Sequence, residues 1–461
     1  MATGTAPART PSASATRGSA SGGPAGGPGP HPPAGPGRGS AWLARLESPL
    51  AAYYLVLGST IALVAIGLVM VLSSSSVESY KINHDSYAVF AKQAMFAGIG
   101  LPLAWVAAVI PIRWWRRLSW PMVAGASAGL VLVAVIGHSV NGNQNWIAVG
   151  GVTLQPSEGA KLALVVWTAT VLARKQQLLH LTSHVVVPVV PVAVVMLGLV
   201  MLGRDLGTAL ILLGLVAALL FTAGAPMRVF LASGVVTGIA VTVLVGTSHN
   251  RMDRVQAWLA GGSPKDYQGA AWQTTHGLWA LASGGWWGVG LGASREKWSW
   301  LPEAHNDFIF AVIGEELGLA GTLVVLALFA ALGIGLFRLV LATDDMFVKI
   351  ATGGVLAWVL GQAVINIGAV LGMLPVIGVP LPLVSSGGSA LVTTLVGLGM
   401  VLGFARRVPG APEALAARAG VVRRSFAVLP HRGAPGQRAP RRSPGSLPGR
   451  RFRPRIPGRR R

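Results

Sequence analysis

Between residues 50 and 405 the chain consists of long apolar runs separated by short polar or glycine-rich segments. A helix needs about 20 apolar residues to cross the hydrocarbon core of a bilayer. Hydrophobic residues make up 52% of the chain and charged residues only 11%, which is outside the range of water-soluble domains. Because backbone that faces lipid must satisfy its own hydrogen bonds, this pattern predicts an all-α polytopic membrane protein.

Ten apolar runs predict ten transmembrane helices, with a large external loop between helices 7 and 8. They cover residues 50–72, 88–110, 118–138, 158–173, 185–202, 206–224, 227–247, 308–337, 347–373 and 386–405. An even number of helices puts both termini on one side of the membrane. Arginines and lysines cluster in the connections on that side, so the positive-inside rule predicts that both termini are cytoplasmic.

The two ends of the chain differ in composition from this membrane domain, which covers residues 48–405. Residues 406–461 contain 16 arginines and one acidic residue, and residues 1–47 are also rich in Pro, Gly, Ser and Arg. Such segments bury too little apolar surface to fold, so we expect two disordered cytoplasmic tails, 1–47 and 406–461. The net charge of +22 then indicates contact with anionic lipid, and we expect no binding to nucleic acid. The absence of cysteine excludes disulfides and thiolate chemistry.

Three segments are expected on the external side, at residues 139–157, 248–306 and 374–389. Loops of this length in a compact protein are usually functional. The segment 248–306 holds seven of the fifteen tryptophans. This indicates an aromatic belt at the membrane interface, and it is also compatible with a groove on the outer leaflet for a lipid-borne substrate.

Several motifs in these segments resemble the SEDS family, the group of FtsW, RodA and SpoVE. The run NIGAVLGMLPVIGVPLPLVSSGGSA (366–390) resembles the family signature. NWIAVGGVTLQPSEGAK (145–161), RDLGTA (204–209) and residues 267–318 resemble its external loops and the elements that follow them. The resemblance covers residues 50–405. The chain departs from it at Gln144 and Asn145, where many members carry an arginine pair, and at Arg204, where proline is common.

The resemblance implies a peptidoglycan glycosyltransferase of the cytoplasmic membrane. Its substrate would be lipid II, a disaccharide-pentapeptide on undecaprenyl pyrophosphate, polymerised into β-1,4 glycan at the outer face. A class B penicillin-binding protein, FtsI-like, and other divisome proteins would be its partners. The run LVMVLSSSSVESY (68–80) and the long tails look more like the division branch at the septum. The alternatives are a RodA-type elongation polymerase, a lipid II flippase or a non-catalytic divisome scaffold, although a flippase should carry ionisable residues through the membrane midplane.

The stretch LPEAHNDFIF (301–310) contains the expected general base. Inversion at the donor sugar requires one base for the acceptor hydroxyl and cationic stabilisation of the leaving pyrophosphate. The family places its essential aspartate at Asp307, whereas the residues alone would favour a helix N-cap there. Glu303 is expected to orient groups or to help Asp307 hold a metal, and His305 to hydrogen-bond substrate.

The expected ligands of the pyrophosphate are basic side chains near this stretch. Lys161 lies three residues after Glu158 on one helix face, so the two either bind substrate or neutralise each other. Arg295 and Lys297 offer two further cations in the external loop.

The turn SSGGS offers backbone N–H groups without bulky side chains. Ser385, Ser386, Gly387 and Gly388 therefore form either an anion-binding nest or a tight re-entrant turn. A divalent cation, Mg²⁺ or Mn²⁺, is expected to bridge a carboxylate and the pyrophosphate. No organic cofactor is expected. Glu315 and Glu316, further along the apolar run, are expected to form structural pairs.

Overall fold

The computed structural model describes residues 50–411, apart from 141–142, 180, 247–248, 260–270 and 299. The expected tails 1–47 and 406–461 therefore lie almost wholly outside the described residues. The α-helices are α2 (Ala51–Asn83), α3 (Ala88–Val109), α4 (Ile112–Ile136), α5 (Pro156–Arg174), α6 (Thr182–Leu202), α7 (Leu206–Thr222), α8 (Met227–Gly246), α9 (His249–Leu259), α10 (Trp272–Gly284), α11 (Ile309–Ala342), α12 (Met346–Val370) and α13 (Gly388–Ala405). The strands are β1 (His138–Val140), β2 (Asn143–Val149) and β3 (Val152–Leu154).

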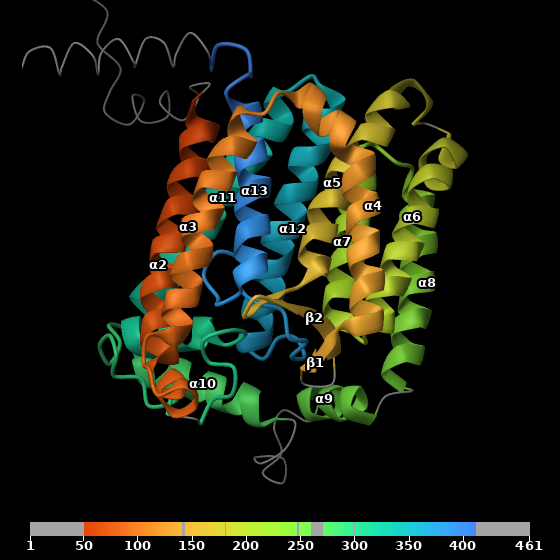
Figure 1. Cartoon of the computed structure of the whole chain (residues 1–461). Coiled ribbons are helices and arrows are strands. Elements are labelled where there is room, and N and C mark those ends of the chain that lie inside the picture. Colours follow the sequence, from red (N-terminus) through yellow and green to blue (C-terminus); the bar gives the residue numbers. More distant parts are fainter. Residues whose placement is uncertain are drawn as a thin grey trace, which may run out of the picture.

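The long helices run side by side as a bundle, with α12 and α13 near its middle (Figure 1). Seven of the described helices, α2, α3, α4, α6, α11, α12 and α13, are long and apolar enough to cross a membrane. The helices α7 and α8 contain shorter apolar stretches, and α5 carries Glu158 and Lys161 among its apolar residues. A multi-pass helical membrane protein is thus confirmed, whereas the number of ten spans stays a prediction.

Glycines bring α13 into close contact with α3. A Cβ added to Gly399 would lie 2.2 Å from the carbonyl oxygen of Ala104, and one added to Gly403 would lie 2.6 Å from that of Ala108. These glycines are four residues apart and so face the same side of α13. Small residues at this spacing let membrane helices approach backbone to backbone, which fixes how α13 and the segment before it sit in the bundle.

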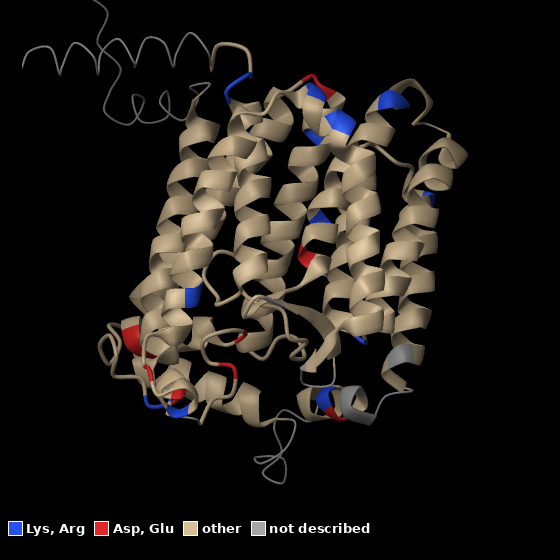
Figure 2. Cartoon of the chain, viewed as in Figure 1, with Lys and Arg blue, Asp and Glu red and all other residues tan. Residues whose placement is uncertain are grey.

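The two ends of the bundle differ in charge and in structure (Figure 2). Lys and Arg gather at the end where α4 begins, and this end is called the basic end below. The opposite end carries α9, α10 and the three short strands, and it is called the loop end. Most of the acidic residues lie there.

The segment 139–157, expected to be an external loop, forms most of a small antiparallel sheet in the order β1-β2-β3. Val149 pairs with Val152 across a two-residue turn, and both turn residues, Gly150 and Gly151, have positive φ angles of 58° and 81°. Two positive φ angles are what a type I′ hairpin turn requires, which explains the glycine pair. The sheet is an addition to the expected all-α fold. Similarly, the expected loop 248–306 contains α9 and α10.

The helix α11 is broken at Gly318, whose φ of 68° and ψ of −166° are not helical. The carbonyl oxygens of Glu315 and Glu316 accept hydrogen bonds from the backbone N–H groups of Val289 and Gly290, at 2.9 and 3.0 Å. Residues 319–342 extend about 36 Å at 1.5 Å per residue, enough to span a membrane alone. The break corrects the expected 308–337 span, which assumed one straight helix.

Candidate active site

A cavity of about 380 Å³ opens at the loop end of the bundle. It is lined by side chains from α5, α7, α9, α10, α12 and the sheet, and by the segments just before α11 and α13. Six of the expected site residues line it: Glu158, Lys161, Glu303, Asp307, Ser386 and Gly387. The fold therefore brings together motifs that lie far apart in the sequence.

Asp307 lies in the wall of this cavity, two residues before α11. The N-cap position of α11 is Phe308 and has no side-chain hydrogen bond, so Asp307 is not used to cap the helix. A Cβ built on Gly378, which has a φ of 71°, would lie 3.7 Å from Oδ2 of Asp307, so the segment before α13 passes directly beside the carboxyl group.

The surroundings of Asp307 make it a stronger base than an ordinary aspartate. Burial raises its pKa from 3.8 to about 7, and the negative charge of Glu303 adds to the increase. The positive charges of Arg254 and His305 act in the opposite direction, and Asp205 again raises the pKa. A pKa close to the working pH is the best compromise between being deprotonated and being able to take a proton.

The Glu158–Lys161 pair lies within the protein and faces the same cavity. Nζ of Lys161 is 2.8 Å from Oε1 of Glu158, and it also donates to Oε1 of Gln362 at 3.2 Å. The two side chains are only 2% and 4% exposed. Glu158 therefore largely neutralises Lys161. Among the described residues, Oε2 of Glu158 is buried and has no hydrogen-bond partner.

Asp205 is a cavity residue to which the sequence analysis gave no role. Its Oδ1 caps α7 by accepting the backbone N–H of Thr208 at 2.9 Å. Its Oδ2 accepts from the hydroxyl of Thr208 at 2.6 Å and from Nδ2 of Asn145 at 2.9 Å. Asn145, one of the departures from the family pattern, thus ties the sheet to the start of α7. The sequence signal was present in RDLGTA, where an aspartate precedes an apolar run.

Arg254 is the second cavity residue that the sequence analysis missed. It lies on α9 and lines the cavity together with Asp307. Within the described part of the chain its guanidinium makes one hydrogen bond, a weak contact of 3.4 Å to the carbonyl oxygen of Val376. In contrast to Lys161, it is a cavity-facing cation that forms no ion pair with a described carboxylate. The basic residues in the polar stretch HNRMDRVQ (249–256) were the available signal.

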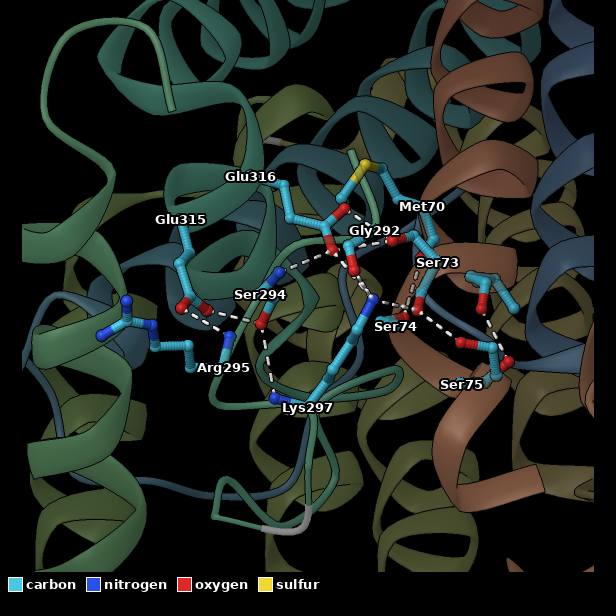
Figure 3. Close-up of polar contacts among 12 residues, drawn as sticks. Met70, Ser73, Ser74, Ser75, Gly292, Ser294, Arg295, Lys297, Glu315 and Glu316 are labelled. Carbon is cyan, nitrogen blue, oxygen red and sulfur yellow. Dashed lines mark hydrogen bonds and ion pairs between the residues drawn. The ribbon is translucent and has the colours of Figure 1, made fainter. Parts of the chain in front are cut away.

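Arg295 and Lys297 lie elsewhere, in a polar cluster at the break of α11, where Lys297 is buried and the side chain of Arg295 is exposed (Figure 3). Nζ of Lys297 donates to the carbonyl oxygen of Gly292 at 2.5 Å and lies 3.5 Å from Oε1 of Glu316. Glu315 accepts the backbone N–H of Arg295 at 2.8 Å. Neither basic side chain lines the cavity, so their expected place beside the pyrophosphate is not supported by this geometry. The two glutamates do form the expected structural pairs.

His305 also lies outside the cavity lining. Its Nδ1 is 3.2 Å from Oε2 of Glu78 on α2. The expected direct contact with substrate is therefore not supported, and the side chain instead links the turn before α11 to α2.

The SSGGS turn is packed against the turn before α11 and against α3. The backbone N–H groups of Ser385, Ser386 and Gly387 donate to Leu381 O at 2.9 Å, His305 O at 3.0 Å and Gln93 Oε1 at 3.2 Å. A Cβ on Gly388 would lie 2.1 Å from the ring of Phe96. The N–H groups of residues 385–387 are therefore occupied, and the missing Cβ of Gly388 makes room for α3.

A protein-only metal site is absent from the described residues, in which no group of three or more His, Cys, Asp or Glu side chains is placed to hold an ion. Asp307 and Glu303 are close enough for their charges to interact. Two carboxylates alone are too few ligands for a stable Mg²⁺ or Mn²⁺ site. The described residues by themselves therefore do not form a complete site for a resident metal ion, and the expected site at Asp307 and Glu303 stays a prediction.

Known proteins are similar to this chain over most of its length. The model of a family described as "Cell cycle protein", FTSW_RODA_SPOVE, matches residues 53–408. A Mycobacterium tuberculosis protein named probable peptidoglycan glycosyltransferase FtsW is 38% identical over 382 residues, which cover 82% of this chain and 72% of that protein. A protein of the same name from Trichlorobacter lovleyi is 37% identical over 366 residues, 79% of this chain and 96% of that protein.

Two solved structures are similar in fold. One chain belongs to a peptidoglycan synthase complex described as coordinating polymerization and crosslinking, with a TM-score of 0.63. The other is the rod shape determining protein RodA of Thermus thermophilus, with a TM-score of 0.57. Both are 28% identical to this chain, and in both the match covers 77% of this chain and 97% of theirs.

Proposed function

The chain belongs to the FtsW, RodA and SpoVE family of cell cycle proteins, and we propose that its cavity polymerises lipid II with Asp307 as the general base. It is a peptidoglycan glycosyltransferase and a multi-pass membrane protein. The observation that carries the base assignment is the carboxyl group of Asp307, which faces the cavity with its pKa raised to about 7.

The proposed reaction is a single displacement at the donor sugar. The 4-hydroxyl of the acceptor sugar attacks the anomeric carbon, the bond to the lipid pyrophosphate breaks, and the configuration inverts from α to β. Asp307 takes the hydroxyl proton as the new bond forms, and the electron pair of the broken bond leaves with the pyrophosphate. A carboxylate nucleophile and a covalent sugar–enzyme intermediate are not needed for inversion.

Arg254 is the proposed partner of the leaving pyrophosphate. A planar guanidinium can donate two parallel hydrogen bonds to phosphate oxygens, and it stays charged at any pH of interest. Lys161 suits this role less, because its ammonium is already paired with Glu158 and Gln362. The free oxygen of Glu158 instead suits a hydroxyl or amide N–H group of the sugar.

A divalent cation is proposed as a companion of the substrate and not as a resident ion. Mg²⁺ or Mn²⁺ bound to the pyrophosphate would neutralise part of its charge. We expect EDTA in excess to reduce polymerisation strongly and added Mg²⁺ to restore it, measured as glycan formed from lipid II. Full activity in excess EDTA would contradict this, and Arg254 would then be the main stabiliser of the leaving group.

The loop end is proposed to face the outside of the cell, because Lys and Arg mark the basic end as cytoplasmic. The chain has no cysteine, so a single one placed at Trp258 of α9 can be labelled cleanly. Labelling by a membrane-impermeant reagent in whole cells is expected. Labelling that requires permeabilised cells would reverse the proposed orientation.

A class B penicillin-binding protein is the proposed partner, since one similar structure is part of a complex for polymerization and crosslinking. A role in septal division is proposed over elongation, because the similar curated proteins carry the name FtsW.

The direct test of the function uses purified chain, its penicillin-binding partner and purified lipid II. We expect glycan chains that a muramidase digests. A lipid II flippase would instead move labelled lipid II across a vesicle membrane and form no glycan, and a scaffold would do neither. Either of these outcomes, with the partner present, would contradict the proposed function.

A further inference from the structure

We propose that Asn366 and the re-entrant turn of Ser385 and Ser386 are a positioning clamp that holds Asp307 by its backbone. Three consecutive carbonyl oxygens before α11 each accept one hydrogen bond from these residues. The oxygen of Asp307 accepts from Nδ2 of Asn366 at 2.7 Å, and that of Asn306 accepts from the hydroxyl of Ser385 at 2.6 Å. The oxygen of His305 accepts from the backbone N–H of Ser386 at 3.0 Å.

These three carbonyl groups need partners from outside the helix. The hydrogen-bond ladder of α11 begins at the carbonyl oxygen of Phe308, which accepts from Ala311 at 2.9 Å and from Val312 at 3.3 Å. Residues 305–307 instead lie in a turn that starts at Glu303, which has a φ of 57°. A turn without such a ladder is free to shift unless other groups fix its backbone, and backbone polar groups within a protein require partners. The clamp fixes the backbone of residues 305–307 and also gives their carbonyl groups hydrogen-bond partners.

Both clamp side chains are buried, and each makes one further hydrogen bond to the backbone of the segment before α13. Asn366 is 3% exposed, and its second N–H donates to the carbonyl oxygen of Val379 at 2.8 Å. Its Oδ1 has no partner among the described residues, so its hydrogen bonds there are donations to the two backbone segments. Ser385 is 4% exposed, and its oxygen also accepts the N–H of Leu381 at 2.8 Å.

The clamp reaches the rest of the cavity through one face of α12. Gln362 lies four residues before Asn366, so their side chains are neighbours on that helix. Gln362 accepts from Lys161 at 3.2 Å and donates to the carbonyl oxygen of Pro380 at 3.1 Å. Through Asn366 and Gln362, this face of α12 holds the backbone of residues 379–380. The same two side chains also contact the backbone of Asp307 and the ammonium group of Lys161.

The clamp rests on the proposed base role of Asp307, and its function is to keep that carboxyl group at the cavity wall. A base has to lie within hydrogen-bond distance of the proton that it removes, so a shift of about 1 Å slows the reaction by roughly 100-fold without changing substrate affinity. The charged groups that act on the Asp307 carboxyl are Glu303, Arg254, His305 and Asp205. A carboxyl group that moves away from this site gains water and becomes a weaker base.

The test compares Ser385→Ala with Ser385→Thr in the polymerisation assay, and it measures kcat, KM for lipid II and the pH dependence of the rate. We expect Ser385→Ala to lower kcat about tenfold or more with KM nearly unchanged, and to move the acid limb of the pH profile to lower pH. Ser385→Thr keeps a hydroxyl group and is expected to recover much of kcat. Asn366→Ala, which removes both donors, should lower kcat further.

The matched control is Ser59→Ala. Ser59 is also 4% exposed, and its hydroxyl bonds within α2 to Leu55, far from the cavity lining. It is expected to leave kcat and the pH profile unchanged. Ser385→Ala can lower the stability of the protein, so kcat is calculated per folded molecule. If this kcat and the acid limb of the pH profile equal those of the wild type, the clamp is wrong. If the wild type itself makes no glycan, the proposed function fails and not the clamp.

Discussion

Asp307→Asn is expected to abolish glycan polymerisation and to leave a folded, membrane-inserted protein. The amide has the same shape as the carboxyl group but does not accept a proton at neutral pH. General-base catalysis contributes about 10²- to 10⁴-fold to a rate, so the loss should reach that range. The fold should tolerate the change, because the N-cap of α11 is Phe308 and the clamp holds the backbone of Asp307, not its side chain. Lipid II polymerisation and thermal unfolding of the purified protein measure the two effects.

The control for this substitution is Asp344→Asn. Asp344 is exposed and follows α11 at the basic end of the bundle, remote from the cavity lining. It is expected to be as active as the wild type. An Asp307→Asn protein that folds normally and still synthesises glycan at a tenth or more of the wild-type rate would remove Asp307 from the mechanism.

Arg254→Ala is expected to have the second largest effect. The guanidinium is the cavity-facing cation without a described carboxylate partner, and the leaving pyrophosphate carries several negative charges. Loss of one such stabilising donor costs about 10²- to 10³-fold in kcat. Arg254→Lys keeps the charge but not the paired hydrogen bonds, so we expect it to recover only part of the rate. Steady-state polymerisation rates at several lipid II concentrations separate kcat from KM.

The comparison variant is Arg295→Ala. The side chain of Arg295 is exposed and does not line the cavity, so the structure predicts a small effect on activity. The sequence alone places Arg295 among the expected ligands of the pyrophosphate. If Arg295→Ala lost as much activity as Arg254→Ala, the division between cavity and polar cluster would be wrong.

The bundle was predictable from the sequence because its signals are local, whereas the base role of Asp307 came from the resemblance to the SEDS family and stays a proposal. Apolar runs mark helices that must bury their backbone in lipid, and LPEAHNDFIF carries its carboxylate in one continuous motif. The hairpin of β2 and β3 was not predicted, although it also had a local signal, the Gly150–Gly151 pair between valines.

The break in α11 was not predictable, because Gly318 is one of many glycines in apolar runs and most of them are helical. Only the backbone of residues 285–290, paired across the break, shows why this one differs. Because of the break, Glu315 and Glu316 meet Ser294 and Lys297 at the loop end and do not lie deep along a straight helix.

The partners of each charge could not be derived from spacing alone. Lys161 and Glu158 lie on one helix face, a spacing that fits either an anion site or a pair that neutralises itself. The structure shows that they form an ion pair and that Lys161 also donates to Gln362. Arg254 and Asp307 are separated by residues 255–306, and no local pattern relates them. The same is true of Ser385 and Asn306, which meet only because the turn before α13 folds back into the bundle.

The central claim is that a carboxyl group with a raised pKa, Asp307, acts as the base, and the pH dependence of lipid II polymerisation tests it most directly. The base works in its ionised form, and the pKa of Asp307 is raised to about 7. The rate should therefore level off above pH 8 and fall about tenfold per pH unit well below pH 7, and the acid limb should disappear from the residual rate of Asp307→Asn. A wild-type rate that stays constant from pH 5 to pH 8 would contradict the account.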